Sequence, residues 1–96
     1  MKKLRIFAAA RQEFDEAIDW YAAQNTSTAE RFEEAVDDKI KSICQKPQLN
    51  PKWDATRRFA IVPGFPYYIV YRVLPNCVEV VAIFHTSRDY SAWIDR

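Results

Sequence analysis

The strongest constraint on the fold is the order of the hydrophobic patterns, which are helical in the first half of the chain and strand-like in the second. In the first half, apolar residues recur at spacings of three and four, and each set therefore falls on one helical face. The two sets are Ala10, Phe14, Ala17, Ile18 and Tyr21, and then Ala29, Phe32, Val36, Ile40 and Ile43. Ser27 with Glu30 predicts a capping box at the start of the second helix, and Pro47 predicts its end. The sequence therefore predicts an antiparallel pair of amphipathic helices.

Four strands are expected around this helical hairpin. They cover residues 3–7 before it and residues 57–62, 67–74 and 77–84 after it, where Val, Ile, Tyr and Phe are dense. The last two runs are apolar at both alternating positions, which indicates a sheet that is covered on both faces. We therefore predict a single α+β domain over residues 1–96, in the order β-α-α-β-β-β. The hairpin is expected to pack on a small antiparallel sheet, and residues 90–96 are expected to form a short tail.

The composition excludes several kinds of site. Lys and Arg number 14 and Asp and Glu number 13, so the formal net charge of +1 gives no bulk attraction to nucleic acid. One glycine is too few for a Gly-rich phosphate loop. One histidine and two cysteines match no familiar structural zinc pattern, so we expect neither a metal nor a cofactor.

We expect the chain to work in the cytoplasm. Arg5 and Arg11 interrupt the apolar start, which leaves no uncharged run long enough for a secretion signal. No stretch approaches the roughly 20 apolar residues of a membrane span, so we expect no membrane partner. Cys44 and Cys77 lie far apart within apolar patterns, which favours two buried, reduced thiols over a disulfide.

The small net charge conceals a separation of charge along the chain. Residues 1–11 carry four bases, residues 12–38 carry nine acids against one base, and residues 39–96 carry nine bases against four acids. The helical hairpin is therefore expected to be acidic outside, and the sheet and its loops basic. This pattern fits ordinary solvated helix faces, and it also fits two surfaces for two partners. In the second case, the basic surface would suit phosphate or an acidic protein groove.

The candidate chemical groups lie at the ends of predicted strands. Arg57 and Arg58 open one strand and point to opposite faces. One of them can pair with an acid of the hairpin, and the alternative is ligand binding. His85, Arg88 and Tyr90 follow the last strand, a position where functional residues often gather. A base, a cation and a phenol can together support metal-independent RNA cleavage. The structural alternatives are that His85 caps backbone groups and that Tyr90 folds the tail onto the sheet.

Several segments, taken in order, point to a known family. They are EAIDWY at residues 16–21, AERF at 29–32, Ile43 with Pro47, RRF at 57–59, FPYYIVYR at 65–72 and HTSRD at 85–89, followed by Trp93 and Arg96. Together they resemble the toxins of the RelE/ParE superfamily, and more closely its ParE-like, plasmid-stabilisation branch. The resemblance covers nearly the whole chain, and the family fold agrees with the order predicted from the patterns.

The resemblance implies the toxin of a type II toxin–antitoxin system, a small bacterial protein of the cytoplasm that arrests growth. Such a toxin is neutralised by a cognate antitoxin whose C-terminal segment wraps it. The complex usually represses its own operon, so operator DNA would be contacted only through the antitoxin. ParE-like members are implied to inhibit DNA gyrase with no catalytic centre, whereas RelE-like members cleave mRNA in the ribosomal A site.

The sequence departs from the nuclease branch at the sheet. Those nucleases carry basic residues on the second and third sheet strands, where this chain has Ala60, Ile61, Val62 and Pro63. The position of their C-terminal tyrosine falls near Trp93, although Tyr90 is close to it. Without an aligned cation, a phosphodiester transition state loses much of its electrostatic stabilisation. We therefore predict a toxin that acts by binding gyrase.

Seven residues are predicted to form the target-binding surface: Arg57, Arg58, His85, Arg88, Tyr90, Trp93 and Arg96. The alternative is a ribosome-dependent mRNA endonuclease of the RelE type, whose catalytic residues would be Arg58, His85, Arg88 and Tyr90. A third hypothesis is a toxin fold without toxicity, which acts only as a partner in a repressor complex.

Overall fold

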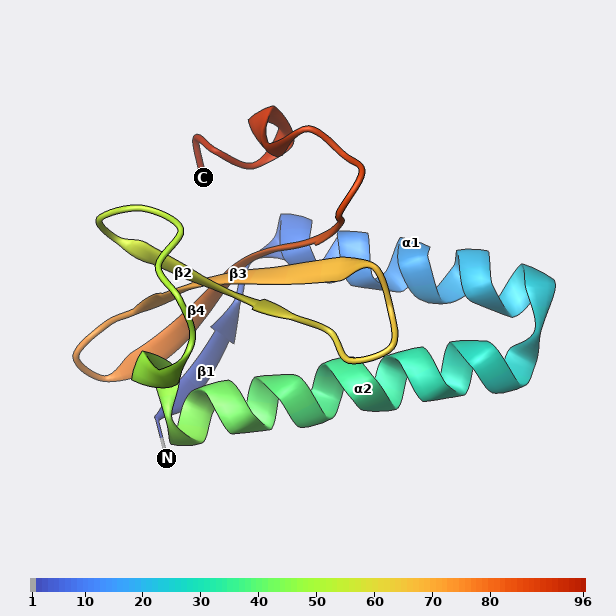
Figure 1. Cartoon of the computed structure of the whole chain (residues 1–96), viewed down its shortest axis with the longest axis horizontal. Helices are drawn as coiled ribbons and strands as arrows, with labels where there is room; N and C mark the ends of the chain where they lie inside the picture. Colours follow the sequence, from blue (N-terminus) through green and yellow to red (C-terminus); the bar gives the residue numbers. More distant parts are fainter. Residues whose placement is uncertain (1) are drawn as a thin grey trace.

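Two long helices and a four-stranded sheet make up most of the molecule. The computed structural model describes residues 2–96, and its elements follow the predicted order (Figure 1). They are β1 (Lys3–Ile6), α1 (Ala8–Gln24), α2 (Thr26–Gln45), β2 (Arg57–Ile61), β3 (Tyr67–Val73) and β4 (Cys77–His85), with 3-10 turns at Pro47–Leu49 and Tyr90–Ala92. The α+β class and the β-α-α-β-β-β order are therefore confirmed.

The helical hairpin forms where the apolar spacing predicts it, but its second helix is capped differently. One residue, Asn25, separates the two helices, and its side chain accepts a hydrogen bond of 3.2 Å from the Thr28 backbone N–H. The predicted capping box at Ser27 and Glu30 is therefore wrong, because α2 already begins at Thr26. Asn caps a helix about as well as Ser does. The cap is therefore Asn25, which comes before Ser27 in the chain.

The sheet is mixed, and this corrects the prediction that it is antiparallel throughout. Its strand order is β1-β4-β3-β2, and β1 runs parallel to β4, whereas the other two neighbouring pairs are antiparallel. The helical hairpin lies between β1 and the remaining strands along the chain. A crossover of that length permits a parallel pair, which a tight turn cannot make.

Both faces of the sheet are covered, as its apolar runs predict. On one face, buried residues of the two helices pack against β3 and β4. On the other face, Trp93 of the C-terminal tail packs against Val70, Val81, Ala82 and Phe84. Figure 1 shows the tail crossing above the sheet, with α2 below it.

The strand β1 is shorter than β4, and this leaves part of β4 as an open edge. β1 pairs only with residues 77–80 of β4. A bulge follows at once, because Val70 pairs with Ala82 and Tyr71 with Val80, which leaves Val81 as an extra residue. Beyond this point, the end of β4 has no strand beside it on the β1 side.

Cys44 and Cys77 are both buried free thiols. Burial raises the pKa of the Cys44 thiol, so this group is neutral and unreactive at neutral pH. No helix within residues 2–96 is long and apolar enough to cross a bilayer. The same residues hold no group of three or more His, Cys, Asp or Glu side chains that could bind a metal ion.

Candidate functional site

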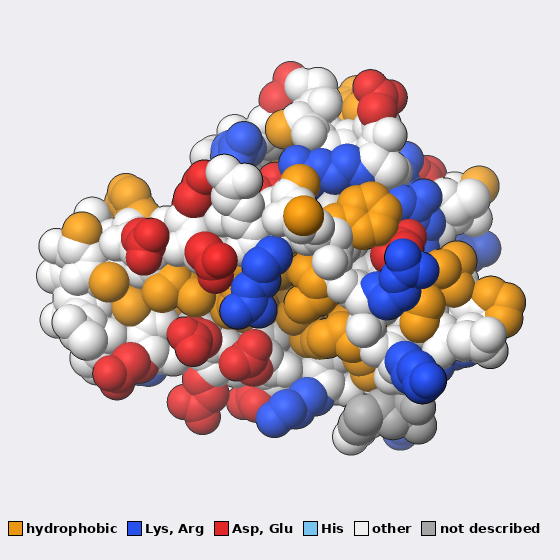
Figure 2. Space-filling model, turned by 180° about the vertical axis from the view of Figure 1, so that it is seen from behind, with side chains coloured by type: hydrophobic (Ala, Val, Ile, Leu, Met, Phe, Trp, Pro, Cys, Tyr) orange, Lys and Arg blue, Asp and Glu red, His pale blue; other side chains and the backbone are white. Residues whose placement is uncertain are grey.

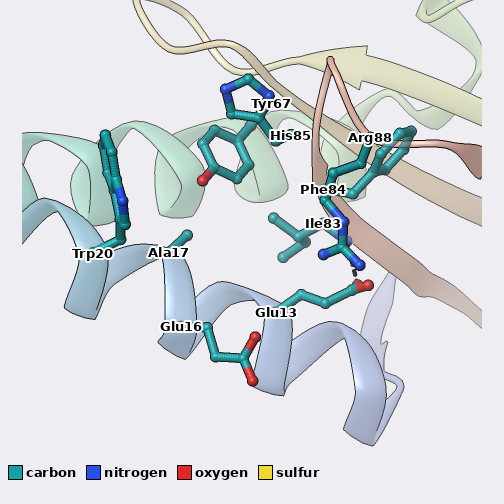
Figure 3. Close-up of a pocket in the computed structure, with 9 residues that line it drawn as sticks. All are labelled: Glu13, Glu16, Ala17, Trp20, Tyr67, Ile83, Phe84, His85 and Arg88. Carbon is teal, nitrogen blue, oxygen red and sulfur yellow. Dashed lines mark hydrogen bonds between the residues drawn. The ribbon is translucent and has the colours of Figure 1, made fainter. Parts of the chain in front are cut away.

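A shallow pocket lies along the open edge of β4. The end of β4 forms its floor, α1 forms one wall, and the loop after β4 forms the opposite rim (Figure 3). The lining residues are Glu13, Glu16, Ala17, Trp20, Tyr67, Ile83, Phe84, His85 and Arg88. Its volume of about 170 Å³ is below the roughly 300–1,000 Å³ of small-molecule sites. A pocket of this size fits one side chain of a larger partner better than it fits a nucleotide.

Arg88 is the cation of this pocket, which we call the Arg88 pocket, and its side chain lacks an internal partner. Among the eight arginines, all of which lie in the described residues 2–96, only Arg88 forms neither an ion pair nor a side-chain hydrogen bond. The others are engaged: Arg5 and Arg72 with Glu79, Arg11 with Asp15, Arg31 with Thr28, Arg57 with Asp54, Arg58 with backbone carbonyls, and Arg96 with Glu13. Figure 3 shows the Arg88 guanidinium extending across the pocket toward α1. Its donors therefore remain available to an anionic group of a partner.

Aromatic rings form much of the remaining pocket surface. Trp20 is 58% exposed, although its ring contacts Tyr21 edge-on at 5.1 Å. Tyr67 and His85 make a T-shaped contact with 5.2 Å between ring centroids. Burial raises the pKa of the Tyr67 phenol, and nearby Arg88 opposes this rise only in part. The phenol is therefore neutral at pH 7.

The imidazole of His85 is engaged by its own loop. Its Nδ1 accepts a hydrogen bond of 3.0 Å from the Ser87 backbone N–H and lies 2.7 Å from the Ser87 hydroxyl. A neutral ring that accepts at Nδ1 carries its proton on Nε2. The nitrogen that a general base would use is thus occupied. This geometry fits the alternative in which His85 caps backbone groups.

An ion pair borders the pocket next to the bulge. Arg96 and Glu13 form a two-pronged pair with nitrogen–oxygen distances of 2.9 and 3.1 Å. The same pair completes the edge of β4, because Glu13 accepts a bond of 3.1 Å from the Ile83 N–H and Arg96 donates one of 3.1 Å to the Val81 carbonyl. At residues 81–83, the two side chains thus take the place of a neighbouring strand.

Arg57 and Trp93 also belong to the internal framework. Arg57 pairs with Asp54 at 2.7 Å, donates to the Ile94 carbonyl at 2.9 Å, and lies over the Trp93 ring. The hydrogen bond from Arg57 holds the pKa of Asp54 below its usual range. Trp93 is only 1% exposed. Together with the Arg96 ion pair, these contacts engage all three side chains within the fold, so the contact surface proposed below does not include Arg57, Trp93 or Arg96.

Arg58 lies far from His85 in the sheet. Arg58 pairs with Tyr71 of β3 and His85 pairs with Tyr67, which separates them by about 13 Å along the strand at roughly 3.3 Å per residue. The Arg58 guanidinium donates to two backbone carbonyls of the loop after α2. The four residues predicted for a nuclease therefore do not converge on one phosphate.

Tyr90 lies at the surface outside the Arg88 pocket, next to Trp53, which packs with the tail on the opposite face of the sheet. It is 53% exposed, and its ring contacts Trp53 at 6.3 Å between centroids. It does not line the pocket itself. Tyr90 therefore stays available to a large partner that extends beyond the pocket.

The surface shows the charge separation that the sequence predicts. On the face drawn in Figure 2, acidic side chains gather over the helical hairpin, whereas Lys and Arg are more frequent toward the sheet. One hollow on α2 is lined by Glu30, Glu33, Glu34, Asp37 and Asp38 with Lys41. It shares no residue with the Arg88 pocket, so the two surfaces are distinct.

Of the nine residues that line the pocket, only His85 and Arg88 were predicted from the sequence as site residues, and Glu13, Tyr67 and Trp20 are the most informative of the other seven. Glu13 resembles any other acid on a helix surface, and Tyr67 resembles any other aromatic in a strand. Trp20 does carry a signal, because this large aromatic lies outside the apolar face defined by Phe14, Ala17 and its neighbours. An exposed Trp of that kind often marks a binding surface.

Comparison with known proteins relates this architecture to one family. The family model described as "ParE toxin of type II toxin-antitoxin system, parDE" matches residues 4–90. A solved structure titled "Chromosomal ParDE TA system from P. aeruginosa" shares the fold, with a TM-score of 0.75 and 16% sequence identity over 91% of this chain and 98% of that chain. No curated protein shows a significant sequence match. Because the family model matches most of the chain, this protein belongs to the ParE toxin family of type II toxin–antitoxin systems.

Proposed function

We propose that this ParE-family toxin arrests growth by binding a large macromolecule at the Arg88 pocket, without breaking covalent bonds. The observation that carries the proposal is the free Arg88 guanidinium, which alone among the arginines in residues 2–96 has no internal partner. Arg and Trp are the residue types that most often dominate protein–protein binding energy. Exposed Trp20 therefore joins Arg88, His85 and Tyr90 in the proposed contact surface.

DNA gyrase is the target that we propose. The resemblance to ParE-like toxins implies it, and gyrase works in the cytoplasm, where we expect the toxin to act. A guanidinium binds carboxylates and phosphates in two-pronged geometry. Gyrase bound to DNA presents both kinds of group, so a free arginine suits either the protein or its nucleic acid.

A supercoiling assay with purified gyrase tests this proposal. The wild-type toxin should inhibit supercoiling or trap cleaved DNA, and Arg88→Ala should raise the inhibitory concentration about tenfold or more, as expected for loss of a central arginine. Arg31→Ala is the matched control, since Arg31 is an exposed arginine of the helical hairpin, away from the pocket. If wild-type toxin at micromolar concentration does not inhibit supercoiling, gyrase is excluded as the target.

The endonuclease alternative is decided by a separate measurement. The geometry disfavours it, because Arg58 lies away from His85 and the accepting nitrogen of His85 is occupied. Primer extension on cellular mRNA after toxin induction should show unbroken messages during growth arrest. New 5′ ends within codons would instead establish cleavage.

A cognate antitoxin is the second partner that we propose, and operator DNA would be contacted through it. Family membership supports this proposal, since the family is defined as one half of a toxin–antitoxin pair. We expect a neighbouring gene to encode a short protein whose co-expression restores growth. Normal growth on expression of the toxin without that neighbour would instead favour the hypothesis of a toxin fold that acts only in a repressor complex.

A further inference from the structure

The end of β4 presents unpaired main-chain groups to the Arg88 pocket. Tyr67, which lies opposite His85, uses its carbonyl for the Val62 N–H and its N–H for the Phe65 carbonyl. Tyr67 and His85 are therefore a non-hydrogen-bonded pair of the antiparallel ladder. The main-chain groups of His85 thus point away from β3, toward the side where β1 has already ended.

Ile83 has the same orientation, because its N–H donates to Glu13 and not to β3. The His85 carbonyl accepts from the Arg88 N–H at 3.0 Å. Two groups remain on this edge without a partner among the described residues, namely the Ile83 carbonyl and the His85 N–H. A carbonyl and an N–H two residues apart are the pair that a single residue of an added parallel strand engages.

The side chains around these two groups define what an added segment would carry. The hollow beside His85 is lined by Trp20, Tyr67, Ser87 and Arg88, and its surface is mostly apolar apart from the guanidinium. An aliphatic or aromatic side chain would be buried between the rings of Trp20 and Tyr67. An acidic side chain on the same face of the segment would reach Arg88, since alternate residues of a strand share a face.

The Glu13–Arg96 ion pair sets where the segment can begin. The pair already occupies the edge of β4 at residues 81–83. On the other side, the turn that the Arg88 N–H closes on the His85 carbonyl borders the pocket through Ser87 and Arg88. Only a short extended stretch fits between these limits, which suits a flexible segment of a partner and not the face of a folded domain.

We infer that a short extended segment of the cognate antitoxin adds to β4 as a parallel strand at Ile83–His85, with an apolar side chain between Trp20 and Tyr67 and an acidic side chain on Arg88. This inference rests on the proposed function for the identity of the partner. It also gives neutralisation a physical basis, because the segment covers the same guanidinium that we assign to the target. Antitoxin and target then compete for Arg88.

Peptides of about 15 residues that tile the antitoxin encoded beside this gene provide the probe. One peptide, with an acidic and an apolar residue in alternate positions, should bind the full-length toxin in a fluorescence anisotropy titration. Binding should weaken about tenfold or more for Trp20→Ala and for Arg88→Glu. Leu4→Ala should have no effect, since Leu4 is 42% exposed and pairs with Val78 near the start of β4, seven residues before His85. Unchanged affinity for both pocket variants would overturn the inference.

Two variants of His85 test the strand addition itself. His85→Ala keeps the edge N–H and His85→Pro removes it, while both remove the ring, so His85→Pro should bind the peptide more weakly than His85→Ala. Amide hydrogen exchange of the unmutated toxin gives the same information without a variant, and the His85 amide should exchange more slowly in the complex. Equal exchange rates in the free and bound toxin would exclude the added strand.

The outcome for gyrase separates this inference from the proposed function. If the peptide binds the pocket but the toxin does not inhibit gyrase, the docking mode stands and the target is wrong. If the toxin inhibits gyrase through Arg88 but no antitoxin peptide depends on Trp20 or Arg88, the target stands and the docking mode is wrong.

Discussion

Arg88 and Arg96 belong to the same C-terminal segment, yet only Arg96 is bound to other groups of the fold. Arg96 is bound in a two-pronged ion pair to Glu13 and donates to two backbone carbonyls, and its side chain is 20% exposed. Arg88 is exposed and has no partner among the described residues. The difference is set by one acid on α1, far away in the sequence. One arginine thus fixes the tail, and the other is left for a partner.

The largest loss of stability should come from a substitution at Trp93, the buried residue of this segment. Trp93→Ala removes a ring that covers the sheet face of Val70, Val81, Ala82 and Phe84, and a cavity of that kind costs about 3–5 kcal/mol. The free energy of unfolding in urea measures it. Tyr90→Ala is the control, because Tyr90 is half exposed and its loss should cost well under half as much. Equal costs would mean that the tail is not anchored by Trp93.

Trp93→Phe refines the same measurement. The indole Nε1 of Trp93 is buried without a hydrogen-bond partner in the described structure. Replacing the indole by a phenyl ring loses apolar contact but also removes that unsatisfied group, whose burial is unfavourable. The phenylalanine variant should therefore be clearly more stable than the alanine variant.

A smaller effect is expected from the ion pair itself. Arg96→Met should lower the free energy of unfolding by about 1.5–3 kcal/mol, because it leaves the Glu13 carboxylate buried and without its cation. Glu13→Gln keeps an oxygen that can accept the Ile83 N–H, so it tests the charge alone. In a double-mutant cycle, the two changes together should cost less than their sum. Strict additivity would show that the pair is not coupled.

These residues also show how far the sequence predicts the structure. Helix spacing, strand composition and the segments shared with ParE-like toxins are local, and they predicted the element order, the bounds to within a few residues and the family. The parallel pairing of β1, the contact between Glu13 and Arg96 and the open edge of β4 depend on pairings distant in the sequence, which no local pattern contains. The sequence could therefore identify Arg88 as a candidate site residue. It could not predict that Arg88 has no ion pair within the fold.

The acid dependence of the Asp54–Arg57 pair is a weaker test of the same framework. The pKa of Asp54 is lowered in the folded state, chiefly by the hydrogen bond from Arg57. The resulting stabilisation is present above the unfolded pKa of about 3.9 and is lost as the pH falls through the folded value. Asp54→Asn should reduce the fall in unfolding free energy between pH 5 and pH 2. The difference should stay under about 1 kcal/mol, because the Asp54 carboxylate is a third exposed. If Asp54→Asn leaves the fall in unfolding free energy between pH 5 and pH 2 unchanged, this pair does not hold the tail.

The smallest effect on stability should come from Arg88, although its effect on function should be large. With no ion pair to break, Arg88→Ala should change the free energy of unfolding by no more than about 0.5 kcal/mol, while it weakens gyrase inhibition and antitoxin binding together. Measuring all three on one preparation separates a binding arginine from a structural one. A loss of stability comparable to that of Arg96→Met would show that Arg88 has an internal partner in solution, and the distinction between the two arginines would then fail.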